Sequence, residues 1–99
     1  FLVAVRERIA SLDGYLTQLQ RTWREEIIEL RGAGLLRGLR LAEGIAVGEV
    51  TTALRDRHLL CVPAADNVLR LLPPLTISED ELVIAHSTLD NYFSEVTAA

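Results

Sequence analysis

Lysine and methionine are both absent from this 99-residue sequence, and its ten basic residues are all arginine. A Schiff base between a protein and a carbonyl compound forms on a lysine amine, so the isolated chain cannot catalyse chemistry that needs one. The chain starts at Phe1 and contains no initiating methionine. We therefore expect a piece of a longer protein.

Cysteine and aromatic residues are also scarce, and acidic residues outnumber basic ones by 14 to 10. The single cysteine, Cys61, excludes a disulfide within the chain and is compatible with a reducing cytoplasm. The net charge of −4 and the aromatic content of 5% argue against nucleic-acid binding. No apolar run approaches the roughly 20 residues of a membrane helix, and no signal peptide is visible. We expect a cytoplasmic protein that binds neither nucleic acid nor membranes.

Hydrophobic residues, by contrast, make up 49% of the chain. That content is high for one small domain, which has proportionally more surface to cover with polar groups. We therefore expect residues 1–99 to form a single domain with an apolar patch that faces another domain or subunit.

The hydrophobic pattern predicts three helices and four strands. Intervals of three and four mark the helices and alternation marks the strands. The helices are expected over residues 1–22, 46–57 and 78–96, and the strands over 27–30, 35–41, 59–62 and 68–72. This order, α-β-β-α-β-β-α, predicts an α+β fold in which helices pack on one face of a small antiparallel sheet. For the first helix a coiled coil is the less favoured alternative, because the flanking positions show no charge pairing.

Two local signals refine this prediction. Gly32 and Gly34 lie between the first two strands and favour a hairpin, since glycine adopts positive φ without steric cost. Ser78 and Glu81 form the S-x-x-E capping box at the start of the last helix, whose buried stripe we expect to be Leu82, Leu89, Phe93 and Val96.

Arg70 is the strongest candidate for a functional residue. It shares one strand face with Val68 and Leu72, just before Pro73 and Pro74 end the strand. An arginine with apolar neighbours should be partly desolvated and should need an anion, and its planar fork suits a carboxylate. The alternative is a structural ion pair, for example with Asp66.

The other chemistry-bearing residues favour structural roles. We expect Asp66 and Asn67 to form a turn, with ligand contact a minor alternative. His58, Cys61 and His86 are too few for a typical zinc site, so His58 should be solvated, Cys61 buried and His86 partly buried. We expect no catalytic, cofactor-binding or metal-ligating residue in the chain, and we expect three arginines on the solvated hairpin or at a domain contact: Arg31, Arg37 and Arg40.

Two segments carry a resemblance to a known family. Residues 66–77 (DNVLRLLPPLTI) and residues 31–39 (RGAGLLRGL) resemble, in order and spacing, segments of the class III pyridoxal-phosphate-dependent aminotransferases. One difference is Ala65, where members usually carry glycine. The resemblance implies the C-terminal small domain of a fold-type I transferase whose large, cofactor-binding domain lies outside this sequence.

The resemblance also implies a function for the parent protein. The most similar members transfer the amino group of N-acetylornithine to 2-oxoglutarate in arginine biosynthesis, as cytoplasmic homodimers that use pyridoxal 5'-phosphate. Members acting on ornithine, succinylornithine or 4-aminobutyrate are the alternatives within the family. By resemblance Arg70 binds the substrate α-carboxylate, and the chain alone, which has no lysine, should be inactive and bind no cofactor. A non-enzymatic amino-acid-binding or interaction module is the alternative from another class.

Overall fold

The computed structural model describes residues 1–98 as three helices and one four-stranded sheet. The elements are α1 (Leu2–Thr22), β1 (Ile27–Ala33), β2 (Leu36–Leu41), α2 (Val47–Asp56), β3 (Cys61–Ala64), β4 (Val68–Leu71) and α3 (Glu79–Ala98), with a short 3-10 turn, η1 (Ala65–Asn67), before β4. The strand order is β1-β2-β4-β3, and all neighbouring strands are antiparallel. The predicted α+β class and element order are confirmed.

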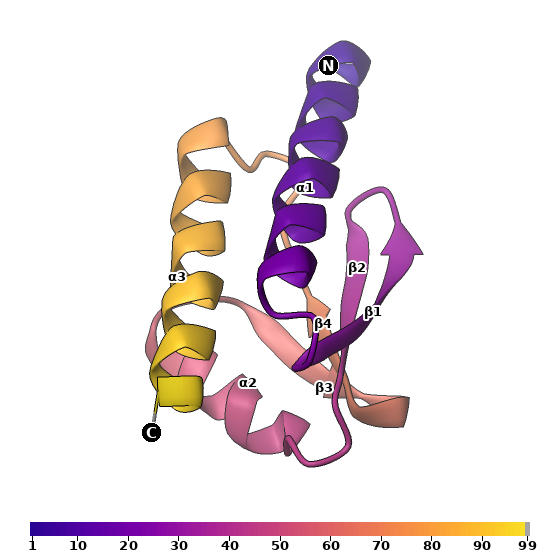
Figure 1. Cartoon of the computed structure of the whole chain (residues 1–99). Coiled ribbons are helices and arrows are strands. Elements are labelled where there is room, and N and C mark those ends of the chain that lie inside the picture. Colours follow the sequence, from indigo (N-terminus) through magenta and orange to yellow (C-terminus); the bar gives the residue numbers. More distant parts are fainter. Residues whose placement is uncertain (99) are drawn as a thin grey trace.

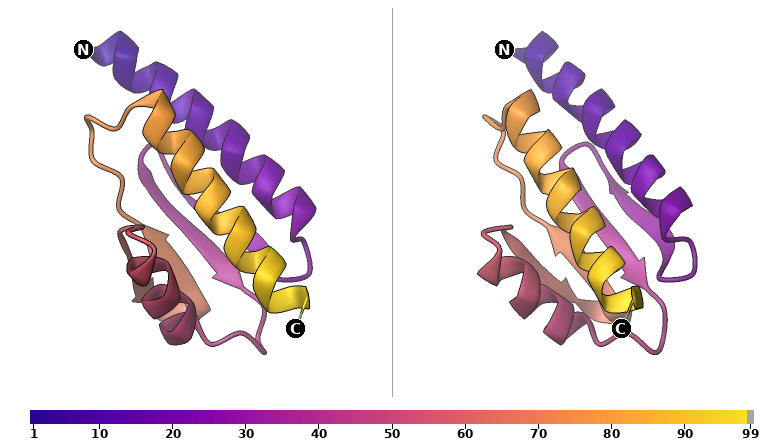
Figure 2. Two further views of the ribbon diagram at one scale, coloured as in Figure 1. Left: turned by 90° about the vertical axis from the view of Figure 1, so that its left-hand side faces the viewer. Right: turned by 60° about the vertical axis from the view of Figure 1, so that its left-hand side comes forward.

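All three helices lie on the same face of the sheet. Figure 1 shows the sheet on one side of α1 and α3, and the left view of Figure 2 shows the helices in front of it. The core fills the space between these layers, where Leu39 and Leu69 from the sheet meet Leu19 and Phe93 from the helices, all four fully buried. The opposite face of the sheet, which we call the outer face, is covered by no helix within residues 1–98.

The predicted hairpin is confirmed at the β1–β2 connection. Ala33 pairs with Leu36, which leaves Gly34 as the first residue of a two-residue loop with φ +61°. At Gly32 φ is +92°, and an added Cβ would lie 1.9 Å from the Leu36 carbonyl oxygen. Only glycine fits at position 32, because a side chain there would collide with the main chain of β2.

Two expectations about the elements are wrong in detail. The third strand starts at Cys61, so Pro63 lies inside it; β3 is an edge strand, where a missing N–H is tolerated. Val96 is 44% exposed, and Tyr92 is buried in the last helix instead. The first turns of α1 project beyond the sheet in Figure 1, and Leu2 in these turns is 70% exposed.

The last helix begins as predicted. The Ser78 hydroxyl accepts a hydrogen bond from the Glu81 amide at 3.1 Å, and the Glu81 carboxylate accepts one from the Ser78 amide at 3.0 Å. These bonds satisfy two amides that the helix leaves free at its start. Within residues 1–98, no helix combines the length and the hydropathy that a membrane span requires.

Candidate functional site

Arg70 lies on β4, one residue before this strand ends. Its cross-strand partners are Gly38 on β2 and Val62 on β3, so its backbone is held between two neighbours. Because successive side chains point to opposite faces, Leu69 and Leu71 enter the core and Arg70 projects from the outer face. The expectation that Arg70 is partly desolvated is wrong for this chain, since nothing within residues 1–98 covers that face and the side chain is exposed.

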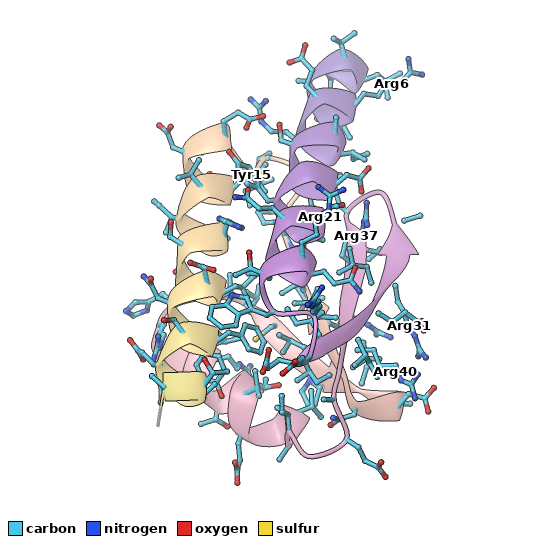
Figure 3. The ribbon with its side chains drawn as sticks, viewed as in Figure 1. Arg6, Tyr15, Arg21, Arg31, Arg37 and Arg40 are labelled. Atoms are coloured by element: carbon cyan, nitrogen blue, oxygen red, sulfur yellow. The ribbon has the colours of Figure 1, made fainter. Side chains whose placement is uncertain are left out.

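The carboxylates of the outer face are bound to a different arginine. Arg31 Nε donates to Glu29 Oε1 at 2.6 Å, and Arg31 Nη1 donates to Asp66 Oδ2 at 3.2 Å. Both bonds raise the pKa of Arg31, and the bond to Glu29 has the larger effect. The alternative in which Arg70 pairs with Asp66 is therefore not observed. Figure 3 shows Arg31 and Arg40 on this side of the sheet. Among residues 1–98, the side chains of Arg40 and Arg70 have no ion-pair or hydrogen-bond partner.

Arg37 does not lie on the solvated hairpin as expected. Residue 37 shares a strand face with Leu39 and Leu41, and this is the face that the helices cover. The residue is only 9% exposed, and its side chain forms an ion pair with Asp13 of α1 and donates from Nε to the Gly34 carbonyl at 2.9 Å. Arg37 thus joins the hairpin to the first helix and is unavailable to a ligand on the outer face.

Asn67 forms the predicted turn and also organises the loop before α2. Asp66 and Asn67 adopt φ values of +63° and +59°, and Ala65 stays outside the left-handed region, so the backbone at Ala65 does not require glycine. The Asn67 Nδ2 donates to the carbonyls of Leu41, Ala42 and Ile45, and its Oδ1 accepts from the Val47 amide at 3.2 Å. The N-cap residue of α2, Ala46, has no side chain that could cap the helix. Asn67, 20 residues later in the chain, takes this role by accepting the hydrogen bond of the Val47 amide.

The three candidate metal ligands do not converge. His58 is exposed just after α2, and Cys61 is fully buried, where burial raises the pKa of its thiol. His86 is a residue of α3, and its ring centroid lies 5.3 Å from that of Tyr15 on α1. Residues 1–98 contain no cluster of three or more side chains that could hold a metal ion. The predicted environments of these residues are confirmed.

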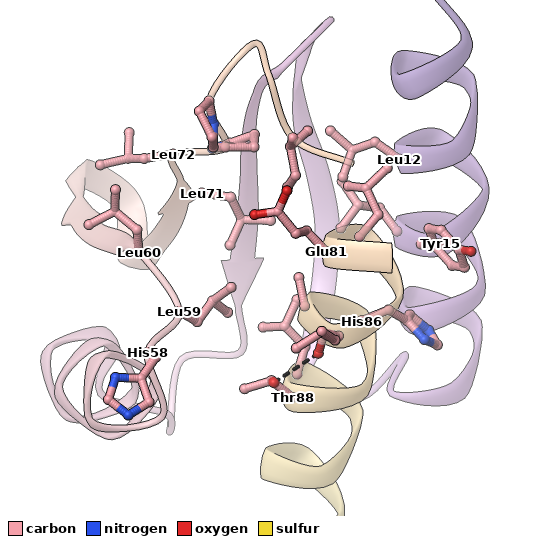
Figure 4. A pocket seen from close by; sticks show the side chains of 18 of the residues that line it. Leu12, Tyr15, His58, Leu59, Leu60, Leu71, Leu72, Glu81, His86 and Thr88 are labelled. Atoms are coloured by element: carbon pink, nitrogen blue, oxygen red, sulfur yellow. Dashed lines mark hydrogen bonds between the residues drawn. The ribbon is translucent and has the colours of Figure 1, made fainter. Parts of the chain in front are cut away.

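A cavity of about 460 Å³ opens on the helix side of the sheet, between α1, α3 and the segments that flank β3 and β4. Figure 4 shows that leucines dominate its wall, among them Leu12, Leu59 and Leu72. Glu81 lines it, but its carboxylate already accepts a hydrogen bond from the Ser78 amide, and the contact with Ser78 lowers the pKa of this carboxyl. The cavity therefore offers no uncommitted charged group of the kind that Arg70 presents, and Arg70 does not line it. For this reason the candidate functional site is the outer face around Arg70.

Sequence comparison finds relatives for most of the chain. No protein-family model matches. The acetylornithine aminotransferase of Rhodobacter capsulatus is 46% identical over 90 residues, which cover 91% of this chain and 22% of that protein. The acetylornithine aminotransferase of Mesorhizobium japonicum is 40% identical over 82 residues, which cover 83% of this chain and 20% of that protein. The chain spans about a fifth of the length of these curated relatives.

Solved structures share the fold. The N-acetylornithine aminotransferase from Stenotrophomonas maltophilia K279a superimposes with a TM-score of 0.81 over 97% of this chain and 27% of that one, at 23% identity. The ornithine aminotransferase from Toxoplasma gondii ME49 matches with a TM-score of 0.78 over 96% of this chain and 23% of that one, at 27% identity.

Proposed function

Because the chain belongs to the acetylornithine aminotransferase family, we propose that it forms the C-terminal small domain of a longer enzyme that transfers the amino group of N-acetylornithine to 2-oxoglutarate. The cofactor of that enzyme would be pyridoxal 5'-phosphate, which supplies an electron sink for amino transfer. The chain does not fit this cofactor on its own, because it has no lysine to bind it. We therefore assign the cofactor to the part of the enzyme outside these 99 residues.

Within this enzyme, we assign to Arg70 the binding of the substrate α-carboxylate. The observation that carries the proposal is an arginine on the uncovered face of a central strand whose guanidinium has no acceptor within residues 1–98. A guanidinium can hold a carboxylate through two parallel hydrogen bonds, which fix the orientation of the acid as well as its position. Orientation of that kind lowers the barrier of a reaction by placing the reacting atoms correctly before the chemical step.

Arg70→Gln in the full-length enzyme tests this role. Loss of a charged, bidentate contact should cost about 3 kcal/mol, which corresponds to a fall in kcat/KM on the order of 100-fold for both the amino donor and 2-oxoglutarate. Arg21→Gln, an exposed arginine of α1, is the matched control and should keep the parent kinetics. Near-parental kinetics of Arg70→Gln would refute the carboxylate role. Separate assays of the parent enzyme with ornithine, succinylornithine and 4-aminobutyrate would identify the amino donor.

We further propose a homodimeric, cytoplasmic enzyme. Exposed large hydrophobic residues, among them Phe1, Leu36, Leu60 and Leu75, support contact with another domain or subunit. The single, buried Cys61 supports a reducing compartment. Analytical ultracentrifugation of the full-length enzyme and cell fractionation test these two statements.

A further inference from the structure

Three leucines form a row across the sheet, one step beyond Arg70 toward the end of its strand. Continued by one residue, the register of β2 and β4 places Leu36 opposite Leu72. The Leu72 amide donates to the Leu60 carbonyl at 3.2 Å, so the row continues onto the segment that leads into β3. We call Leu36, Leu72 and Leu60 the leucine row.

The leucine row faces the same side of the sheet as Arg70. Leu72 follows Arg70 by two residues, so the alternation of side chains places both on the outer face. In β2, Leu36 precedes the inward-facing Arg37 and therefore also faces outward. Figure 4 shows the side chains of Leu60 and Leu72 pointing away from α1 and α3.

Much of this apolar surface is uncovered. Leu36 is 74% exposed and Leu60 is 58% exposed, while Leu72 is half-buried. Leu60 and Leu72 also line the cavity on the helix side, so the apolar surface continues around this end of the sheet. Contiguous exposed apolar surface marks a site that another molecule or protein segment covers.

The chemistry beside the leucine row indicates what covers it. Its neighbour is the Arg70 guanidinium, which has no acceptor among residues 1–98. A cation next to apolar surface matches a molecule with a carboxylate at one end and hydrocarbon behind it, since binding sites combine apolar walls with a few placed polar groups. A purely apolar partner would instead leave the guanidinium desolvated and unpaired.

The spacing suits a short aliphatic acid. Leu72 lies two residues beyond Arg70, about 7 Å along the strand, and Leu36 occupies a diagonal position about 7–8 Å from Arg70 at the backbone. A straight chain of five carbons spans about 5 Å, from bond lengths of about 1.5 Å. An acid held by Arg70 can therefore extend its hydrocarbon over the leucine row.

We propose that the leucine row is an apolar subsite that binds the hydrocarbon chain of the acid whose carboxylate is held by Arg70. The subsite favours acids with several methylene groups, such as N-acetylornithine, over shorter ones. Hydrocarbon that covers the row also excludes water from the ion pair beside it, which strengthens the attraction between the two charges. The inference rests on the function proposed above for Arg70.

Competitive inhibition of the full-length enzyme by straight-chain monocarboxylates, from acetate to pentanoate, tests the subsite, because these acids bind without reacting. With 2-oxoglutarate as the varied substrate, the Ki of the parent should fall about fourfold for each added methylene group that the row covers. Leu36→Ala should reduce this factor to about twofold and leave the Ki of acetate unchanged. Val83→Ala, at an exposed valine of α3 on the helix side, is the matched control and should keep the parental factor.

Three results would overturn the proposal. The first is a parental Ki that does not depend on chain length. The second is an unchanged dependence on chain length in Leu36→Ala; if its thermal midpoint also falls, another part of the enzyme covers the row. The third is an equal rise of Ki for every acid in Leu36→Ala, because Leu36 would then act only through Arg70.

Arg70→Gln distinguishes this inference from the proposed function. This substitution should raise Ki by the same factor for every acid, acetate included, because all of them share the carboxylate. If it does so and Leu36→Ala does not alter the dependence on chain length, only the present inference fails. If Arg70→Gln leaves the Ki of acetate unchanged, the proposed function fails.

Discussion

Asn67→Ala should lower the free energy of unfolding of the domain by about 3–4 kcal/mol. The Nδ2 group has two hydrogens for its three carbonyl acceptors, of which the Ile45 carbonyl at 2.7 Å and the Ala42 carbonyl at 3.0 Å are the nearer. With the bond accepted from the Val47 amide, the side chain makes about three net hydrogen bonds, worth about 1 kcal/mol each and somewhat less where water replaces them. Alanine at φ +59° adds about 1 kcal/mol of backbone strain.

Two further substitutions separate the side-chain bonds from the backbone strain. Asn67→Gly tolerates the left-handed conformation, so its cost of about 2–3 kcal/mol should reflect the lost hydrogen bonds and the greater freedom of glycine in the unfolded chain, without backbone strain. Asn67→Asp keeps an acceptor for the Val47 amide but places a carboxylate oxygen opposite three carbonyl oxygens. It should destabilise the domain at neutral pH by at least as much as glycine does.

Urea denaturation followed by circular dichroism measures these free energies, with the slope against denaturant as a check on two-state unfolding. The thermal midpoint of Asn67→Ala should fall by roughly 15–30 °C, since each kcal/mol shifts a domain of this size by about 4–8 °C. Ordinary surface substitutions change the free energy of unfolding by up to about 0.5 kcal/mol. An effect of Asn67→Ala within this range would refute the assignment of Asn67 as a distant cap. So would an Asn67→Asp variant as stable as the parent.

Further substitutions probe three other features: the close approach at Gly38, the Arg37–Asp13 ion pair and the capping box at Glu81. Gly38→Ala should cost about 1–3 kcal/mol, because its Cβ would come within 2.7 Å of Val68 Cγ1, and Val68→Ala in the same molecule should recover part of that loss in a double-mutant cycle. Arg37→Ala should cost about 2 kcal/mol, measured by urea denaturation, because Arg37 is buried and also binds a backbone carbonyl. Asp13→Asn should cost less than about 1 kcal/mol in the same assay, because the Asp13 side chain is 53% exposed; equal losses would contradict this reasoning. The capping bonds lower the pKa of Glu81, so its stabilising contribution is complete above the unfolded-state pKa and is lost as the pH falls through the lowered value. Thermal unfolding between roughly pH 2 and 7 should show a weaker acid dependence for Glu81→Gln, and an unchanged profile would exclude this contribution.

Periodicity predicted the class and the order of the elements, and Pro73 and Pro74 placed Arg70 near a strand end. The class and the order depend on side chains three, four or two residues apart, which the sequence displays directly. The same alternation also places Arg37 in a row with Leu39 and Leu41, and so contained the signal for its buried position. The expectation of a solvated Arg37 came from treating arginine as a surface residue, although its ion pair with Asp13 allows burial.

The role of Asn67 could not be predicted in the same way. Its hydrogen-bond partners lie 20 to 26 residues earlier in the chain, and only the folded loop brings them to its side chain. The exposure of Arg70 was mispredicted for a related reason, since the residues on its own strand are apolar while the face above it is open within residues 1–98. What lies opposite a residue in space is a property of the tertiary fold.

The position of β4 inside the sheet also limits how the domain can respond to a bound acid. Hydrogen bonds to β2 and β3 clamp the main chain at Arg70 from both sides, so this amide should exchange with deuterium only on large-scale opening. The guanidinium therefore adjusts through its own torsion angles. Any larger approach toward a substrate has to move the whole sheet as one body.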